Sequence, residues 1–286
     1  MNRHSVLKPT PTIEFGVGAI NNLSRYVPTL EGATLIVTGS QSFSRSGKKG
    51  SIEVLLSEDC SQLIWSTVDQ EPSPEIIDAI VRNNRKQDIT RVIGIGGGSV
   101  LDTGKAVSAM LPSGQPVQTF LEDVGSTAPT GEKIPYIAIP TTSGTGSEAT
   151  SNAVVSQNGL GGFKKSLRHD NYIPNVALID PLLMVSCPRT VTAACGMDTF
   201  SQLIEAYLST QSLPETDAIS YKGIQAVHQS LLNACQNGED ITARSQMALA
   251  SLFSGICLLN AGLGTVHGLA PALGLSLIHI SETTRP

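Results

Sequence analysis

Four small residues, Gly96-Gly-Gly-Ser99, form a turn whose spacing could place a phosphate group against the backbone. The apolar residues just before them, from Val92 to Ile95, predict a short buried strand, and residues 100–110 predict a helix. A strand, a glycine turn and a helix in this order present several backbone N–H groups and the positive end of the helix dipole to one point. We therefore expect a phosphate or pyrophosphate here. The spacing differs from the G-x-G-x-x-G fingerprint, and a glycine turn without a ligand is the alternative.

A second loop has the composition of a ligand-lining segment. Thr141-Thr-Ser-Gly-Thr-Gly-Ser-Glu148 follows the apolar stretch Ile134 to Pro140 and contains five hydroxyl side chains and two glycines. Hydroxyls donate or accept hydrogen bonds, and glycines let the backbone approach a ligand closely. A solvated Ser/Thr loop is the alternative. Two such loops at the carboxyl ends of strands favour a ligand site, because ligands of open sheets gather at that edge.

These two loops make the chain resemble the iron-containing (group III) alcohol dehydrogenases. The resemblance rests on Gly96-Gly-Gly-Ser-x-x-Asp102-x-x-Lys105 and Pro140-Thr-Thr-Ser-Gly-Thr-Gly-Ser-Glu148, and it continues in order from about Ile13 to Gly274. Its later motifs are Pro174-Asn-Val-Ala-Leu-Ile-Asp-Pro181, Gly196-Met-Asp198 and Gly264-Thr-Val-His267-Gly. The resemblance implies an α/β nucleotide-binding domain with a parallel sheet, followed by an all-α domain, as in dehydroquinate synthase-like proteins. Metal and substrate would lie in the cleft between them.

The resemblance also implies the residues that contact a nicotinamide coenzyme. Gly97, Gly98 and Ser99 would take the pyrophosphate, with Asp102 at the same loop. The remaining expected contacts are to the phosphates, riboses and nicotinamide, and they come from Thr141, Thr142, Thr145 and Lys165. A solvent-facing lysine is the equal alternative for Lys165.

The coenzyme could be NAD or NADP. Gly39 and Ser40 follow the first predicted strand, where many NAD-preferring members of the family place an Asp. A carboxylate there repels a 2′-phosphate, whereas Gly39 does not and Ser40 could donate a hydrogen bond to one. We therefore expect that NADP is tolerated, and which of the two coenzymes is preferred stays open.

The metal site implied by the resemblance departs from the family pattern. Members hold one divalent metal, iron(II) or zinc, with one Asp and three His, and the Asp and the first His lie four residues apart on one helix. Here those positions are Asp198 and Gln202, and His267 matches the next ligand. The carboxamide of Gln202 is a weak, neutral ligand, so we expect low metal affinity and an incomplete site. The alternative is that Asp198, Gln202 and Glu205 form a solvated helix face.

Two further positions bear on catalysis. Many members carry a second His four residues after the one matched by His267, where this chain has Pro271. Proton transfer would then use water, a ribose hydroxyl or another side chain. We assign no catalytic residue beyond the metal site.

The elements that must position these residues fall into two parts. Strands are predicted at residues 34–37, 63–65, 92–95, 136–139 and 176–179, with helices at 74–86 and 100–110 between them, which implies parallel βαβ units. Residues 153–167 predict an inserted β-hairpin. After Pro188 the pattern is helical, with an apolar stripe of Phe200, Leu203, Ile204, Tyr207 and Leu208 and helices at 216–234 and 243–259, the last buried. We expect domains at residues 1–185 and 186–274.

Composition restricts the class of protein. A net charge of -5 and no basic run argue against nucleic acid as a partner, and no apolar stretch approaches the roughly 20 residues of a membrane span. The N-terminus lacks the apolar segment of a signal peptide. Five scattered cysteines, with no C-x-x-C pair, indicate free thiols in the cytoplasm. A homo-oligomer stays open.

The last residues, from about 275 to 286, fit neither the preceding helix nor the family. They resemble a translated sequencing-adapter tail, so we expect them to be non-native and do not count His279 as a ligand. The helical domain would then continue for on the order of 100 residues more in the parent protein, the size of a small domain.

The resulting hypothesis is a metal-dependent, NAD(P)-linked alcohol dehydrogenase or aldehyde reductase. It would transfer hydride reversibly between the nicotinamide and a small alcohol or carbonyl compound, with the metal as Lewis acid. One alternative is a nucleotide-binding fragment that cannot turn over. A less favoured one is a dehydroquinate synthase-like lyase, which would need basic residues in the cleft to grip its substrate.

Overall fold

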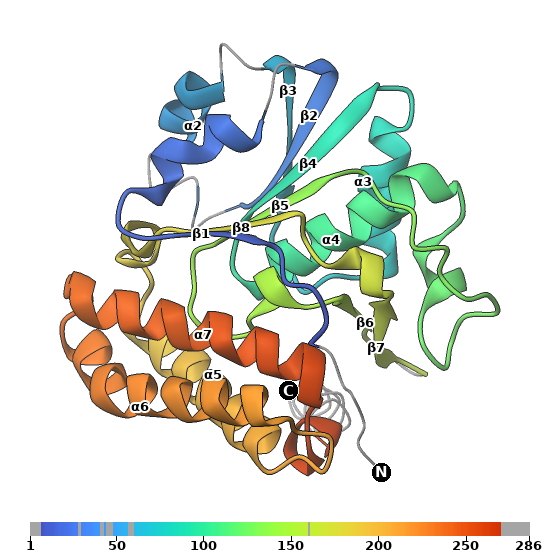
Figure 1. The fold of residues 1–286 in the computed structure, drawn as a ribbon. Coiled ribbons are helices and arrows are strands. Elements are labelled where there is room, and N and C mark those ends of the chain that lie inside the picture. The colour runs from blue at the N-terminus through green and yellow to red at the C-terminus, as the bar shows by residue number, and fades with distance from the viewer. Residues whose placement is uncertain are drawn as a thin grey trace, which may run out of the picture.

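A computed structural model describes residues 7–27, 30–40, 43, 48–56, 60–159 and 161–269. Pro271, His279 and the suspected tail lie outside the described residues. In the described part, six strands form one sheet, two more form a hairpin, and helices surround the sheet or follow it in the chain (Figure 1). The strands are β1 (Thr12–Phe15), β2 (Leu30–Gly39), β3 (Cys60–Val68), β4 (Ile89–Gly96), β5 (Tyr136–Pro140), β6 (Asn152–Gln157), β7 (Phe163–Arg168) and β8 (Val176–Ile179). The α-helices are α2 (Lys49–Leu56), α3 (Pro74–Asn84), α4 (Gly98–Ser113), α5 (Arg189–Tyr207), α6 (Pro214–Gln236) and α7 (Ile241–Ala261).

The sheet has the order β1-β8-β5-β4-β2-β3, and all its paired strands are parallel. Short 3-10 turns also occur, including η1 (Ala19–Tyr26) and η5 (Pro181–Met184). Because the strands are parallel, the turns that follow β4 and β5 meet at one edge of the sheet. The expected α/β architecture with a parallel sheet is confirmed.

Both faces of the sheet are buried, which explains the near-continuous apolar character of its strands. Leu35 and Val92 belong to a core formed with α3 and α4, while their neighbours Ile36 and Ile93 belong to a second core formed with η1 and α2. Figure 1 shows these two helical layers on opposite sides of the sheet. Alternate residues of each strand therefore serve opposite cores.

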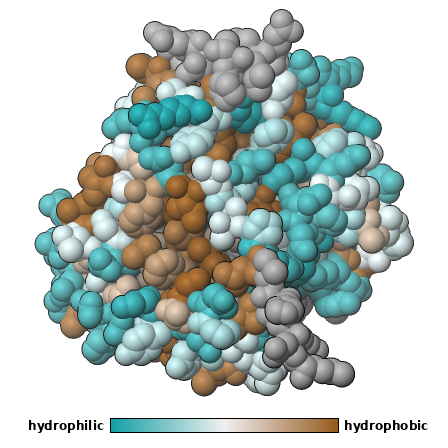
Figure 2. Space-filling model, viewed as in Figure 1, coloured by the Kyte–Doolittle hydropathy of each residue, from teal (hydrophilic) through white to brown (hydrophobic). Residues whose placement is uncertain are grey.

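The second half is all-helical and packs against β8 through α7. Ala177 and Ile179 of β8 share a core with Ala248, Leu252 and Ile256 of α7. Helix α7 is largely buried, as its apolar composition predicts, and Figure 2 shows apolar residues gathered on this face in the region of α7.

Arg244 of α7 fastens the start of α5 to α7 with hydrogen bonds from a buried position. Its guanidinium donates to the hydroxyl of Thr192 over 2.8 Å and to the carbonyl oxygens of Gly238 and Cys187 over 2.9 and 3.0 Å. Because three acceptors depend on one side chain, the start of α5 is held firmly against α7.

The hairpin expected at residues 153–167 is present as the antiparallel pair β6 and β7. Two elements were not predicted: β1, which is short and mostly exposed, and α2. The apolar stripe on α5 is only partly right, because Leu203 is buried but Tyr207 and Leu208 are 44% and 73% exposed. The physical reason is that α5 ends at Tyr207, so this last part of the stripe has little to pack against.

No helix among the described residues is long and apolar enough to cross a membrane. The four described cysteine side chains, Cys187, Cys195, Cys235 and Cys257, are free thiols, in agreement with the sequence. The domain boundary near residue 186 stays a prediction.

Candidate active site

The glycine turn lies where β4 passes into α4. Gly97 precedes the helix in extended conformation, and no side chain caps the helix there. The first amide groups of α4 are therefore left for a ligand or solvent. Gly98 and Ser99, the first two residues of the helix, line a cavity of about 590 Å³.

The Thr/Ser loop packs directly onto this turn. The Thr141 amide donates to the Gly96 carbonyl over 2.9 Å. A Cβ atom at Gly98 would lie 2.7 Å from the Thr145 methyl carbon, and one at Gly97 would lie 3.3 Å from the Thr142 hydroxyl. The glycines are therefore needed for close approach of the two loops, and the structure brings the two expected phosphate-binding segments together.

Lys105 is the buried anchor of this arrangement. Its Nζ donates to the carbonyl oxygens of Ser147 and Asn152 and to the hydroxyls of Ser147 and Thr150, over 2.8 to 3.1 Å. It thereby ties α4 to the Thr/Ser loop and to β6. Burial lowers the pKa of Lys105 to about 8, although Asp102 lies 3.9 Å away. The motif contains Lys105, but we predicted no role for it.

Asp102 has a different environment from the one expected. Its carboxylate accepts hydrogen bonds from the Ser147 hydroxyl over 2.5 Å and from the Val154 amide over 3.0 Å. Burial raises its pKa, against the opposing effects of Lys105 and Ser147. Asp102 lines the cavity, and its oxygens hold the loop and the hairpin; its expected place at the coenzyme stays a prediction.

The cavity brings together residues from both halves of the chain. The coenzyme-loop residues on its wall are Gly98, Ser99, Asp102 and Thr145, and Lys165 joins them from the hairpin. Asp198, Gln202 and His267 line the same cavity from the helical half. The other predicted residues, Gly39, Ser40, Gly97, Thr141 and Thr142, lie outside this lining. Of these, Gly97, Thr141 and Thr142 contact the lining loops, and Ser40 is hydrogen-bonded to the end of β3.

The hairpin gives the cavity a basic side. Lys164, Lys165 and Arg168 line it, and each is paired with an acidic residue from outside the hairpin: Glu71, Asp123 and Glu122, respectively. Lys165 contacts Asp123 over 2.8 Å and is about one third exposed. It therefore faces both the cavity and solvent, and the two alternatives for it stay open.

The expected metal ligands lie next to one another. His267 Nε2 is 3.1 Å from Asp198 Oδ1, and the Gln202 amide donates to Asp198 Oδ2 over 2.9 Å. Gln202 is 4% exposed, and its Oε1 atom is buried without a hydrogen-bond partner. The alternative of a solvated helix face is therefore wrong for Gln202.

Glu205 is a site residue that the sequence analysis missed. Its side chain is 10% exposed, and one of its oxygens contacts His267 Nδ1 while the other accepts from the Val266 amide over 2.6 Å. Hydrogen bonds to Asp198 and Glu205 raise the pKa of His267 despite its partial burial. The spacing of Asp198, Gln202 and Glu205, at i, i+4 and i+7, was the available signal.

The donors fit a divalent cation only with the help of Gln202. Within the described ranges, no group of three His, Cys, Asp or Glu side chains is placed to hold a metal ion. The Oε1 of Gln202, which is buried without a hydrogen-bond partner, would be the further oxygen needed with Asp198 and His267. A carboxylate, an amide oxygen and an imidazole nitrogen together are an acceptable but weak donor set.

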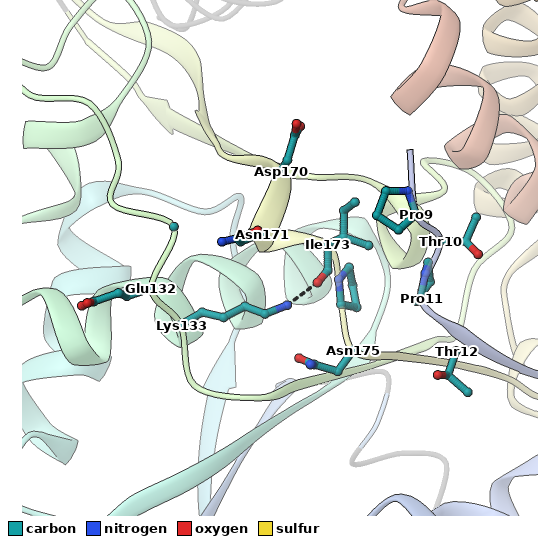
Figure 3. Close-up of a pocket in the computed structure, with 12 residues that line it drawn as sticks. Pro9, Thr10, Pro11, Thr12, Glu132, Lys133, Asp170, Asn171, Ile173 and Asn175 are labelled. Carbon is teal, nitrogen blue, oxygen red and sulfur yellow. Dashed lines mark hydrogen bonds between the residues drawn. The ribbon is translucent and has the colours of Figure 1, made fainter. Parts of the chain in front are cut away.

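A second cavity, of about 650 Å³, contains none of the predicted site residues (Figure 3). It lies at the amino ends of β1, β5 and β8, the edge of the sheet opposite the glycine turn. Lys133 points across it and donates to the Ile173 carbonyl, as Figure 3 shows. Because ligands of open sheets bind at the carboxyl edge, the first cavity is the better candidate site.

Comparison with known proteins identifies the family of this chain. The family profile "Iron-containing alcohol dehydrogenase" matches residues 9–181, and the profile "Fe-containing alcohol dehydrogenase family, C-terminal" matches residues 192–281, which extends past the expected break at 275. Long-chain-alcohol dehydrogenase 1 of Geobacillus thermodenitrificans is 35% identical over 92% of this chain, and NAD-dependent methanol dehydrogenase of Bacillus methanolicus is 38% identical over 66% of it. These alignments cover 66% and 49% of the two relatives, respectively.

A solved structure supports the same comparison. Sulfoacetaldehyde reductase from Bifidobacterium kashiwanohense, in complex with NAD+, superimposes with a TM-score of 0.87 at 27% identity. The match covers 98% of this chain and 72% of that one. The chain spans about two thirds of the length of Long-chain-alcohol dehydrogenase 1.

Proposed function

The chain belongs to the iron-containing alcohol dehydrogenase family, and from that premise we propose that it binds a nicotinamide dinucleotide and serves reversible hydride transfer between this coenzyme and a small alcohol or carbonyl compound. The observation that carries the proposal is the single cavity lined by the glycine turn, the Thr/Ser loop, the basic hairpin and the Asp198–Gln202–His267 group. It provides phosphate-binding amides at one part of its wall and metal-type donors at another.

The coenzyme would lie along the first half of the cavity. The pyrophosphate would meet the amides of Gly98 and Ser99 at the start of α4, and the hydroxyl of Thr145 would approach it from the facing loop. Lys165 would reach the nicotinamide ribose. Lys105 and Asp102 would hold these two loops in place.

The second half of the cavity would hold one divalent ion. Asp198, Gln202 and His267 would be its ligands in this chain, with Fe2+ or Zn2+ as the candidates. When bound, such an ion acts as a Lewis acid on the substrate oxygen. Glu205 and the helix that begins near residue 265 would orient His267, and Leu258 and Leu263 would exclude water from this part of the cavity.

We infer that NADP is accepted as well as NAD. None of the residues at the end of β2, Thr38, Gly39 and Ser40, has a carboxylate, whose negative charge would repel a 2′-phosphate. We also infer that the protein works in the cytoplasm. A homo-oligomer is our inference from the edge strand β1, because Ile13, Phe15 and Val17 are 39%, 37% and 59% exposed.

Two alternatives to a dehydrogenase remain. A dehydroquinate synthase-like lyase would need basic groups from the helical half, yet in the described part that half lines the cavity with no lysine or arginine. The other alternative is a fragment that binds the coenzyme but does not turn over. It is favoured by a different observation, the weak set of metal donors around Gln202.

One experiment separates the enzyme from the binding-only fragment. Calorimetric titration with NAD+ and NADP+ should show binding of both. In a separate assay with NADH or NADPH, loss of the reduced-coenzyme absorbance should occur only when a small aldehyde and Fe2+ or Zn2+ are present. Asp198→Asn should abolish turnover but leave coenzyme binding unchanged. Binding without turnover under all metal conditions would favour the fragment, and the absence of any coenzyme binding would refute the proposal.

A further inference from the structure

The middle of the Thr/Ser loop lies against α5. Thr199 of this helix is fully buried, and its hydroxyl donates to the Gly144 carbonyl oxygen over 2.9 Å and to the Ser143 carbonyl oxygen over 3.3 Å. We propose that Thr199 is a positioning residue that holds the Thr/Ser loop in the conformation that receives the coenzyme. This inference rests on the proposed function, because it gives Thr199 a task at the coenzyme side of the same cavity.

The two ends of the loop are held by the sheet half of the chain. At its start the Thr141 amide donates to the Gly96 carbonyl over 2.9 Å, and near its end Lys105 Nζ donates to the Ser147 carbonyl over 2.8 Å. Thr145, which lines the cavity, lies between these two anchors. The hydrogen bonds from α5 act on the two residues just before Thr145, so they hold the part of the loop that faces the coenzyme.

Gly144 supplies an independent indication that the loop is fitted to α5. A Cβ atom at Gly144 would lie 2.9 Å from the Cys195 Cβ atom and 3.2 Å from its Cα atom. Cys195 and Thr199 are four residues apart, so they lie on the same face of α5. Ser143 adds a contact from its hydroxyl to the Met184 sulfur over 3.1 Å, which is a weaker acceptor. The absence of a side chain at residue 144 therefore lets the loop come within reach of the Thr199 hydroxyl.

The type of residue at position 199 matters because of what it faces. Carbonyl oxygens can only accept hydrogen bonds, so Ser143 and Gly144 need a donor on α5. A valine at this position would have the same shape but would leave both oxygens without this partner, in a buried place where a lost hydrogen bond is costly. Asp198, the preceding residue, points into the cavity instead. One turn of α5 thus serves the cavity directly and through the loop.

The test compares the full wild-type chain with Thr199→Val, which loses the hydroxyl, and Thr199→Ser, which keeps it. The first measurement is the amide hydrogen exchange of residues 141–148 without coenzyme, followed by mass spectrometry. A net hydrogen bond corresponds to about a 2- to 10-fold change in an equilibrium constant. We therefore expect the loop to exchange faster by about this factor in Thr199→Val and at the wild-type rate in Thr199→Ser.

The second measurement is the affinity for NAD+, determined by calorimetry. A loop that is correctly placed for a smaller fraction of the time lowers the apparent affinity by that fraction. We expect the Kd for NAD+ to rise by about 2- to 10-fold in Thr199→Val and to stay unchanged in Thr199→Ser.

The matched control is Thr192→Val. Thr192 is another buried threonine on α5, but its hydroxyl bonds the Cys187 carbonyl and the Arg244 guanidinium instead of the loop. This variant should unfold at a lower urea concentration than the wild type while loop exchange and NAD+ affinity stay unchanged. It therefore separates positioning of the loop from a general loss of stability.

The outcomes decide the role of Thr199 in either direction. Wild-type exchange and affinity in Thr199→Val, or equal changes in Thr199→Ser or Thr192→Val, would overturn it. If Thr199→Val does not fold, Gly144→Ala provides both measurements, because the added methyl group should push the loop away from Cys195 and change both values in the same direction; wild-type values in this variant would also overturn the role.

Failure of the proposed function gives a different result. A wild-type chain that binds no NAD+, with faster loop exchange in Thr199→Val but not in Thr199→Ser, would support Thr199 as the anchor of the loop and count against the proposed function.

Discussion

At the residue scale, the Thr/Ser loop contains a carboxyl group, that of Glu148, buried away from water. Glu148 is 2% exposed, and burial raises its pKa from 4.5 to about 7, against the opposing effects of a backbone hydrogen bond and Lys105. The folded state therefore holds the proton more tightly than the unfolded chain. The stability that this proton contributes is fully present below the unfolded pKa and is lost as the pH rises through about 7.

We predict that Glu148→Gln removes this part of the pH dependence. Each pKa unit corresponds to about 1.4 kcal/mol, so between about pH 5 and pH 7.5 the wild type should lose on the order of 3 kcal/mol of unfolding free energy relative to the variant. Urea unfolding at several pH values measures the difference. Glu75→Gln, at an exposed position on α3, should behave like the wild type. Parallel curves for Glu148→Gln and wild type would contradict the prediction.

The sequence identified many of the residues that the structure gathers around the cavity, but not their partners. Ser99, Thr145 and His267 could be found because their motifs are local. The hydrogen bonds of Lys105 and Asp102 connect segments more than forty residues apart, and nothing in the spacing reveals them. Glu205 was missed because its partner lies 62 residues away.

At the element scale, the Thr/Ser loop and α7 meet through two glycines. Gly146 has φ of 62°, and a Cβ atom there would lie 2.5 Å from the Gly255 backbone nitrogen. A Cβ at Gly255 would collide in turn with the Gly146 carbonyl group. The contact is backbone against backbone, so neither side can yield by rotating a side chain.

Gly255→Ala should therefore destabilise the protein by about 1–3 kcal/mol, the usual cost of overpacking, and weaken coenzyme binding because the loop must move. Urea unfolding and NAD+ titration measure the two effects. The matched control is Gly50→Ala in α2, where a Cβ would meet nothing within 4 Å. It should be neutral or stabilising by up to about 1 kcal/mol. Equal stability of the two variants would show that the loop adapts freely.

The elements themselves were predictable where their hydrophobic patterns are long. The expected helix at residues 243–259 corresponds to α7, and the expected strand at 92–95 lies inside β4. Strand β1 was missed because its four residues are mostly exposed and show no periodic burial. Its place in the sheet depends on pairing with β8, which is far away in the sequence.

At the scale of the whole molecule, the cavity is lined by residues from both halves of the chain. The coenzyme loops come from the sheet half, and Asp198, Gln202 and His267 come from the helical half. A coenzyme that contacts both should couple their stabilities, because binding to the folded state alone shifts unfolding by mass action.

We predict that NAD+ at about 100 times its Kd raises the free energy of unfolding by about 2.7 kcal/mol. Hydrogen exchange should slow both in the β6–β7 hairpin and in residues 264–269. Mass spectrometry of exchanged peptides measures both regions in one experiment. Slower exchange in the hairpin alone would show that the coenzyme does not reach the helical half. Helix α2, on the far side of the sheet, serves as the internal control.

The three ion pairs of the hairpin make its outer contacts depend on the salt concentration. Glu71–Lys164, Asp123–Lys165 and Glu122–Arg168 lie at or near the surface, so dissolved salt screens them and each contributes little to stability. The buried ammonium of Lys105 at the base of the same hairpin is shielded from that screening. Rising ionic strength would therefore weaken the contacts of β7 with Glu71, Asp123 and Glu122, whereas the hydrogen bond from Lys105 to Asn152 at the start of β6 would persist.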